Sequence, residues 1–266
     1  MNYCFLNGQT LLYKDCNLHI SDLLLQRGYG VFDFFRSRNG SIPWLEDYTD
    51  RLFNSIRLSG IEAPMNRQEF TSTINDLQQK NGSEYEAFKV IVTGGYSDKL
   101  ENVTGSPNII ILNVPWKRPP QETFEKGVNL ISCEYQRPNP EIKTLNYFNS
   151  LRLSKKLKEY DAVDVLYHTN TITETSRASV FFVEGAKIYT TKSNILPGIT
   201  RKNILSLFPE IKTNNIAIDK LYEFDEIFLT STSRDVTPVV SVDGKKIGDG
   251  KPGRVTIEIM NAFSPK

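Results

Sequence analysis

A single lysine, Lys143, lies in the stretch EIKTLNYFNS, residues 141 to 150, between a predicted strand end at Ile142 and an apolar-periodic segment. The neutral amine of a lysine attacks a carbonyl and forms a Schiff base when burial or nearby cations lower its pKa. The apolar neighbours place the stem of Lys143 close to buried surface. Most lysines are solvated surface charges, so the pattern alone leaves covalent chemistry and a surface role both open.

A second candidate is the motif NILPGITR, residues 194 to 201, which predicts a Pro-Gly turn that opens a helix. The backbone amides of Ile199 and Thr200 would then point outward from the helix N-terminus, where they suit a phosphate. An ordinary capped helix start gives the same motif. The motif is therefore a candidate anion site.

The histidines and cysteines limit the kinds of active site that the chain can form. The chain has two histidines, His19 and His168, whereas most metal sites and Ser-His-Asp arrangements need a well-placed imidazole. The three cysteines, Cys4, Cys16 and Cys133, are odd in number and widely spaced, which is typical of reduced thiols rather than a disulfide framework or a zinc site. Hydrolase triads and metalloenzymes are thus disfavoured.

Composition indicates a globular protein without a nucleic-acid partner. The chain of 266 residues is 39% hydrophobic and 24% charged, and its 32 basic and 31 acidic residues leave a formal charge of +1. No apolar run reaches the length of a membrane span, and the opening residues MNYCFLNGQTLLYKDCNL are too polar for a signal peptide. We expect a cytoplasmic protein with no membrane contact.

The elements that must position Lys143 and the NILPGITR motif mix strands and helices. Helices are predicted over 45–59, 70–82, 145–160 and 199–208, with a last one after Pro252. In the helix over 145–160, Leu145, Phe148 and Leu151 are expected to pack inward. Strands are predicted at 31–36, 87–93, 108–114, 129–135, 163–168, 179–183, 187–190, 226–230 and 239–242. This pattern predicts an α/β (α+β) fold.

A domain boundary is predicted at PWKRPP, residues 115–120, where three prolines and two cations interrupt every periodic pattern. We expect a smaller N-terminal α/β domain over 1–114 and a larger, strand-rich C-terminal domain over 121–266.

The stretch IKTLNYFNS resembles the cofactor-lysine segment of the fold-type IV pyridoxal-phosphate enzymes, the class IV aminotransferase family. Four further segments resemble the same family in the same order, so that the resemblance spans about residues 5 to 263. These segments are LEDYTDRLFNSIRLSGI, TITETSRASVFFV, NILPGITRKNIL and DEIFLTSTSRDVTPV.

The resemblance implies a cofactor, pyridoxal 5'-phosphate, and a role for each matching residue. Lys143 would be the Schiff-base lysine. Glu174 would face the pyridine nitrogen, where a carboxylate keeps that nitrogen protonated and makes the ring a better electron sink. Tyr147, one helical turn beyond Lys143 on the same face, would hydrogen-bond the phenolic oxygen. The residues implied at the cofactor phosphate are Arg51, Ile199, Thr200 and Thr232.

Without the resemblance, these residues also fit structural roles. Arg51 could be a solvated charge beside Asp50, Glu174 a strand-edge acid and Tyr147 an ordinary helix aromatic.

The chain departs from the family pattern in a segment where substrate contacts are expected. The family usually reads S-D-R-G-x-x-[YF]-G-D-G-V-F-E where this chain has SDLLLQRGYGVFD. Arg27 stands where an aromatic residue usually lines the substrate pocket, and a cation there would favour a substrate with an acidic group. Substrate contact is further expected from Phe32, from Lys89 and, through backbone amides, from the region of Ser233.

The resemblance thus implies a two-domain pyridoxal-phosphate aminotransferase that exchanges an amino group between an amino acid and a 2-keto acid, with most of the cofactor site on the larger domain. The alternatives are a lyase of the aminodeoxychorismate lyase type and a non-catalytic family member that binds a ligand or partner. Family members borrow residues across a subunit interface, so a homodimer is expected.

Overall fold

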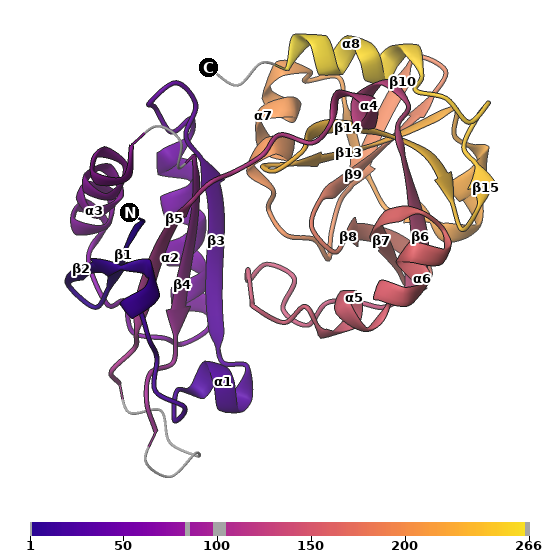
Figure 1. The fold of residues 1–266 in the computed structure, drawn as a ribbon. Helices are drawn as coiled ribbons and strands as arrows, with labels where there is room; N and C mark the ends of the chain where they lie inside the picture. Colours follow the sequence, from indigo (N-terminus) through magenta and orange to yellow (C-terminus); the bar gives the residue numbers. More distant parts are fainter. Residues whose placement is uncertain (1, 83–85, 98–104, 264–266) are drawn as a thin grey trace. The chain divides into compact units, whose positions relative to one another are not determined.

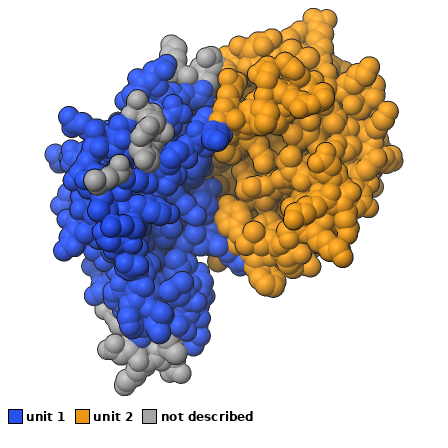
Figure 2. Space-filling model, in the orientation of Figure 1, with its two compact units in different colours: residues 1–117, 142–146, 266 blue, residues 118–141, 147–265 orange. Residues whose placement is uncertain are grey.

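The computed structural model describes residues 2–82, 86–97 and 105–263. The chain divides into two compact units (Figure 2). Unit 1 comprises residues 1–117 and 142–146, and unit 2 comprises residues 118–141 and 147–265. The first boundary, between Lys117 and Arg118, falls inside the expected connector 115–120.

The expectation of one continuous domain over 121–266 is wrong in one segment, because Ile142–Asn146 belongs to unit 1. The physical reason is backbone pairing. The Lys143 carbonyl accepts a hydrogen bond from the Phe32 N–H at 2.9 Å, and Thr144 forms a bridge with Val31. The lysine segment is therefore built into unit 1 although both flanking stretches belong to unit 2.

Unit 1 contains a five-stranded antiparallel sheet in the order β2-β1-β5-β4-β3 (Figure 1). Its strands are β1 (Tyr3–Leu6), β2 (Gln9–Leu12), β3 (Gly30–Arg36), β4 (Ala87–Thr93) and β5 (Ile109–Val114). Its helices are η1 (Tyr13–Asp15), α1 (Leu23–Arg27), α2 (Leu45–Leu58) and α3 (Arg67–Asn81). The longer helices, α2 and α3, pack against the sheet.

The predicted helices of unit 1 are confirmed, and α3 shows why. Asn66 and Glu69 form a capping box at its N-terminus, which satisfies backbone donors that the helix leaves unpaired. Phe70, Ile74 and Leu77 recur at helical spacing and are all buried. Burying each such side chain contributes about 1.5–3 kcal/mol, so this face holds α3 on the sheet.

Unit 2 contains a second, mixed sheet with the strand order β11-β10-β9-β13-β14-β6-β7-β8-β12, and β15 pairs with β14. Its strands are β6 (Val128–Glu134), β7 (Ala162–His168), β8 (Thr171–Thr175), β9 (Ser179–Glu184), β10 (Lys187–Thr191), β11 (Lys212–Asn214), β12 (Ile216–Ala217), β13 (Glu226–Ser231), β14 (Asp235–Val242) and β15 (Lys245–Lys246). Its helices are α4 (Gln121–Glu125), α5 (Phe148–Arg152), α6 (Ser154–Glu159), α7 (Ile199–Leu207), η2 (Ile218–Glu223) and α8 (Arg254–Ala262).

The sheet of unit 2 is largely buried on its central strands. Phe181 on β9 and Phe228 on β13 are fully buried and stack with their ring centroids 4.7 Å apart. Both α7 and α8 pack against β13, as Figure 1 shows for α8 at the edge of this unit. Turns and helix termini project from the ends of these packed strands.

The single helix predicted over 145–160 is wrong. The structure has two short helices, α5 and α6, and residues 142–146 are non-helical, with Thr144 in an isolated bridge to Val31 on β3. Phe148 and Leu151, expected to pack inward, are 74% and 68% exposed. The apolar spacing is present, but pairing of the preceding segment with β3 delays the helix start to Phe148.

Within the described ranges, no helix is long and apolar enough to cross a bilayer, and no group of three or more His, Cys, Asp or Glu could hold a metal ion. The three cysteines are free thiols. Only Cys4 is a core residue, since Cys16 and Cys133 are half-buried.

Candidate active site

Both polar groups of the Lys143 backbone are bound by unit 1. Its carbonyl oxygen accepts from Phe32, as described above, and its N–H donates to the hydroxyl of Ser55 on α2 at 3.2 Å. The next residues continue the pairing, because the Leu145 N–H donates to the Gly30 carbonyl at 3.4 Å. The lysine is therefore presented from a segment fixed on one side by β3 and on the other by α2.

The side chain of Lys143 is half-buried, with its Nζ 4.7 Å from the centroid of the Phe32 ring. The Nζ of Lys89 on β4 lies 5.7 Å from the same ring. The structure thus brings Lys143, Lys89 and Phe32, all expected site residues, close to one another. The Lys143 amine is therefore held in a half-buried position against an aromatic ring.

Arg51 is buried on α2 and pairs with Asp33 on β3. Its Nε and Nη2 donate to the two carboxylate oxygens of Asp33 at 2.9 and 2.6 Å. The alternative of a solvated charge beside Asp50 is wrong, because Asp50 instead pairs with Arg67. The sequence pattern gave no reason to expect Asp33 as the partner, since the pair joins a strand to a helix across the unit.

Arg27 lies at the exposed C-terminal end of α1. The helix is anchored by the fully buried Asp22, whose carboxylate accepts from the Leu24 N–H, from the Thr93 hydroxyl and from the Asn108 amide. Arg27 itself donates to the carbonyl of Gln26, its neighbour in sequence. Asp22 was not among the expected site residues, although it determines where Arg27 is held.

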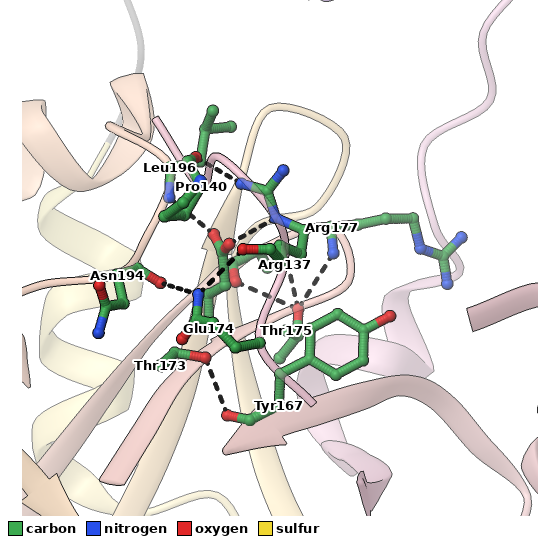
Figure 3. A network of polar contacts seen from close by, with 11 residues as sticks. Arg137, Pro140, Tyr167, Thr173, Glu174, Thr175, Arg177, Asn194 and Leu196 are labelled. Atoms are coloured by element: carbon green, nitrogen blue, oxygen red, sulfur yellow. Dashed lines mark hydrogen bonds and ion pairs between the residues drawn. The ribbon is translucent and has the colours of Figure 1, made fainter. Parts of the chain in front are cut away.

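Glu174 lies on β8 and is almost fully buried (Figure 3). One carboxylate oxygen accepts from the Nε of Arg137 at 2.7 Å, and the other accepts from the Leu196 N–H at 2.9 Å. Arg137 is itself oriented by the Pro140 carbonyl, to which its Nη2 donates at 2.6 Å. Glu174 is therefore a fixed acidic group rather than a strand-edge acid, and its partner Arg137 was not among the expected site residues.

Tyr147 does not share a helix face with Lys143, contrary to expectation. Residues 143–147 are non-helical, and Tyr147 is the N-cap residue of α5. Burial, reinforced by the negative charge of Asp164, raises the pKa of the Tyr147 phenol to about 12. The phenol therefore stays protonated at neutral pH and keeps an O–H that can donate a hydrogen bond.

The N-terminus of α7 has the features of an anion site. Gly198 is its N-cap and makes no side-chain cap, while Ile199 and Thr200 are buried in the first turn. The first amides of a helix have no partner within the helix, and their dipoles favour a negative group. A Cβ at Gly198 would lie 2.7 Å from the Ser179 hydroxyl, so the glycine permits close approach of β9 to this turn.

Thr232 and Ser233 lie in the tight turn that joins β13 to β14. The pairing of Ser231 with Asp235 closes this turn, and the hydroxyls of Ser231 and Ser233 lie 3.5 Å apart. The expected site residues are thus divided between the units. Lys143, Arg51, Phe32, Lys89 and Arg27 belong to unit 1, and Tyr147, Glu174, Ile199, Thr200, Thr232 and Ser233 belong to unit 2.

Comparisons with a family model and with known proteins point to the same family. The amino-transferase class IV family model matches residues 30–242. D-alanine aminotransferase from Bacillus licheniformis is 29% identical over 267 residues, which cover 97% of this chain and 94% of that protein. A putative branched-chain-amino-acid aminotransferase from Methanocaldococcus jannaschii is 28% identical over 275 residues, with the same coverage of 97% and 94%.

Solved structures show the same fold. The branched-chain amino acid aminotransferase of Escherichia coli aligns with a TM-score of 0.91 and 26% identity, covering 98% of this chain and 93% of that one. The branched-chain amino acid aminotransferase of T.th., solved with pyridoxamine 5'-phosphate, aligns with a TM-score of 0.88 and 23% identity, covering 98% and 92% of the two chains.

Proposed function

Because the chain belongs to the class IV aminotransferase family, we propose that it exchanges an amino group between an amino acid and a 2-keto acid, with Lys143 as the covalent and proton-transferring residue. The cofactor is pyridoxal 5'-phosphate, whose ring supplies the electron sink for this chemistry. The observation that carries the proposal is the placement of Lys143, whose backbone is fixed by β3 and Ser55 and whose amine lies against Phe32.

Other expected site residues have chemistry that suits this cofactor. The first-turn amides of α7, at Ile199 and Thr200, suit its phosphate, with Thr232 and the guanidinium of Arg51 as further contacts. We assign Glu174 to the pyridine nitrogen, since Arg137 and the Leu196 amide already hold its carboxylate in one orientation.

We assign the proton transfer to Lys143 and a supporting hydrogen bond to Tyr147. Lys143 takes the proton from the substrate Cα as a base and returns it as an acid, which requires an amine that is partly desolvated. Tyr147, whose pKa of about 12 keeps the phenol protonated, would donate a hydrogen bond to the phenolic oxygen of the cofactor.

The test is an absorption spectrum of the protein with pyridoxal phosphate, before and after addition of single amino acids. Glutamate, the branched-chain amino acids and both enantiomers of alanine form the first panel. We expect a visible band that shifts toward the pyridoxamine form with at least one donor. The donor that shifts it identifies the substrate class.

Borohydride reduction followed by peptide mass spectrometry locates the attachment. We expect the cofactor on Lys143 and its loss in Lys143→Ala. Lys89→Ala is the matched control, since the Lys89 amine lies near the same Phe32 ring, and this variant should keep the attachment. Attachment to another lysine contradicts the assignment of Lys143.

Two other outcomes would replace the transaminase proposal. Release of pyruvate from aminodeoxychorismate without a keto-acid acceptor would make the protein a lyase. A bound cofactor with no half-reaction across the panel would make it a non-catalytic member that binds a ligand or partner.

We also propose a homodimer that acts in the cytoplasm. The free thiols of Cys4, Cys16 and Cys133 are consistent with a reducing compartment. Light scattering of the purified protein measures the oligomeric state, and a monomeric mass at micromolar concentration would contradict the dimer.

A further inference from the structure

We propose that Arg234 is an anion-binding residue of unit 2 that takes the α-carboxylate of the substrate. This inference rests on the proposed function, because it names the group that recognises the substrate of that reaction. It concerns a residue to which neither the sequence analysis nor the family assignment gives a role.

Arg234 is the third residue of the turn that contains Thr232 and Ser233. The turn is closed by the Ser231–Asp235 pair, and the Thr237 hydroxyl donates to the Arg234 carbonyl at 2.9 Å. The backbone at Arg234 is therefore fixed. Its side chain starts from the same turn whose neighbouring amides are proposed to contact the substrate carboxylate.

Strand pairing places this turn beside a second arginine. The register of β13 with β9 ends where Thr230 pairs with Ser179. The residues just before Ser179 form the β8–β9 turn, which carries Arg177. Two loops that bear guanidinium groups thus leave adjacent strands at the same end of the sheet.

The carboxylate in this region, Asp164, is already occupied. Asp164 is fully buried on β7 and accepts from the Val165 N–H at 2.8 Å, from the Thr175 hydroxyl at 3.0 Å and from the Ser176 hydroxyl. The Nε of Arg177 lies 3.6 Å from the same carboxylate. The Asp164 carboxylate therefore already accepts three hydrogen bonds and pairs with the guanidinium of Arg177.

Arg234 lacks such partners. In the described residues, its guanidinium makes no hydrogen bond and no ion pair within 4 Å, although the residue is half-buried. Burial lowers the pKa of Arg234, the positive charge of Arg177 lowers it further, and Asp164 opposes this shift. A partly buried cation without a hydrogen-bonded counter-charge is costly, so Arg234, unlike Arg177, favours a negative ligand.

The chemistry of the guanidinium identifies that ligand. Its planar fork matches a carboxylate through two parallel hydrogen bonds. Every amino acid and every 2-keto acid has an α-carboxylate, whereas the phosphate of the cofactor is already assigned to the N-terminus of α7. Arg234 therefore supplies the charged part of a receptor whose neutral part is the backbone of the Ser233 turn.

The experiment compares a carboxylate with its uncharged amide. The cofactor-loaded protein is titrated calorimetrically with propionate and 4-methylvalerate, which have no amino group and cannot react, and with propionamide and 4-methylvaleramide. We expect Arg234→Ala to weaken binding of the acids roughly 10- to 100-fold, the loss typical of a hydrogen bond to a charged group, and to change amide binding less than about threefold. Arg234→Lys should bind the acids with intermediate affinity.

Two control variants isolate the effect. Arg254→Ala removes an exposed arginine that pairs with Glu258 on α8 and should leave both titrations unchanged. Arg234→Gln keeps most of the stem and a polar tip, so it replaces Arg234→Ala if that variant unfolds. Thermal unfolding of each variant verifies that the protein is intact.

Equal losses for acids and amides, or no loss for either, would overturn the proposal and make Arg234 a structural residue. A different result would contradict the proposed function. If wild-type protein binds acids through Arg234 but no amino acid shifts its spectrum, the carboxylate site is supported and transamination is not.

Discussion

The backbone N–H of Lys143 donates to the hydroxyl of Ser55, which is fully buried on α2 one helical turn beyond Arg51. The same helix face therefore holds the lysine segment and, through Arg51, the carboxylate of Asp33 on β3. A serine with no chemistry of its own thus positions the residue proposed to do the chemistry.

The first prediction concerns this hydrogen bond. Ser55→Ala should leave the fold intact but cost about 1 kcal/mol, the net value of such a bond, because the Lys143 amide loses its partner. We expect faster hydrogen exchange at the Lys143 amide and weaker covalent attachment of the cofactor. Ser59→Ala, at the end of the same helix, is the control, because among the described residues the Ser59 hydroxyl donates only to the Ile56 carbonyl. Unchanged exchange at Lys143 in Ser55→Ala would show that Ser55 does not position it.

The Asp33–Arg51 pair gives a prediction on stability. Asp33→Ala should lower the free energy of unfolding by about 3–5 kcal/mol, because it removes a buried carboxylate and leaves buried guanidinium nitrogens without it. Asp50→Ala breaks the exposed pair with Arg67 and should cost about 1 kcal/mol or less. Urea unfolding of both variants measures the difference, and equal costs would contradict a buried role for Asp33.

A third prediction concerns the start of α8. The carboxylate of Glu226 accepts from the Val255 N–H at 3.0 Å, from the Thr256 N–H at 2.7 Å and from the Thr256 hydroxyl at 2.6 Å. Glu226→Ala should therefore destabilise the protein by about 1–2 kcal/mol, as expected for the loss of a helix cap. Glu258→Ala, on the exposed face of α8, should cost clearly less. The melting temperatures of the two variants provide the comparison.

The capping contact of Glu226 can also be tested by a substitution at Gly253. A Cβ at this position would lie 1.9 Å from the Glu226 carboxyl carbon, so Gly253→Ala must displace the capping side chain. We expect the double variant Glu226→Ala/Gly253→Ala to be no less stable than Glu226→Ala alone. Additive losses would show that Gly253 has a separate reason to be glycine.

The fourth prediction is a pH dependence. Burial is the main cause that raises the pKa of both Tyr147 and Tyr167 to about 12, from an ordinary value of 10.0. The unfolded chain loses these protons at lower pH than the folded chain. The stability they contribute is therefore present below about pH 10 and is lost as the pH rises toward 12.

Thermal unfolding between about pH 8 and 11 tests whether stability falls as the pH rises. The melting temperature of wild-type protein should fall across the upper part of that range. The double variant Tyr147→Phe/Tyr167→Phe should show a smaller fall. An identical slope in the two proteins would exclude these phenols as the cause.

Local sequence patterns predicted the elements whose determinants are local. Phe70, Ile74 and Leu77 were placed correctly on α3 because helical periodicity is a property of neighbouring residues. The family resemblance itself is confirmed by the match over residues 30–242. The same approach failed at Phe148 and Leu151, where the apolar spacing of a helix is present but the preceding segment is drawn into pairing with β3.

The contacts that the sequence did not predict share one property, which is that the two partners are distant in sequence. Asp33 meets Arg51 from another element, Arg137 meets Glu174, and Ser55 meets Lys143. No spacing rule links such residues, because sheet register and helix packing bring them together. Residue types alone therefore suggest the reactive groups, while the groups that orient them require the fold.

The pairing of residues 142–146 with β3 also bears on biosynthesis. β3 is the terminal strand of its sheet, and the lysine segment covers part of its outer edge. That segment leaves the ribosome only after all other strands of unit 1 and after β6. The nascent N-terminal half therefore carries an open strand edge, a site for wrong pairing, until the segment that contains Lys143 is synthesised and covers it.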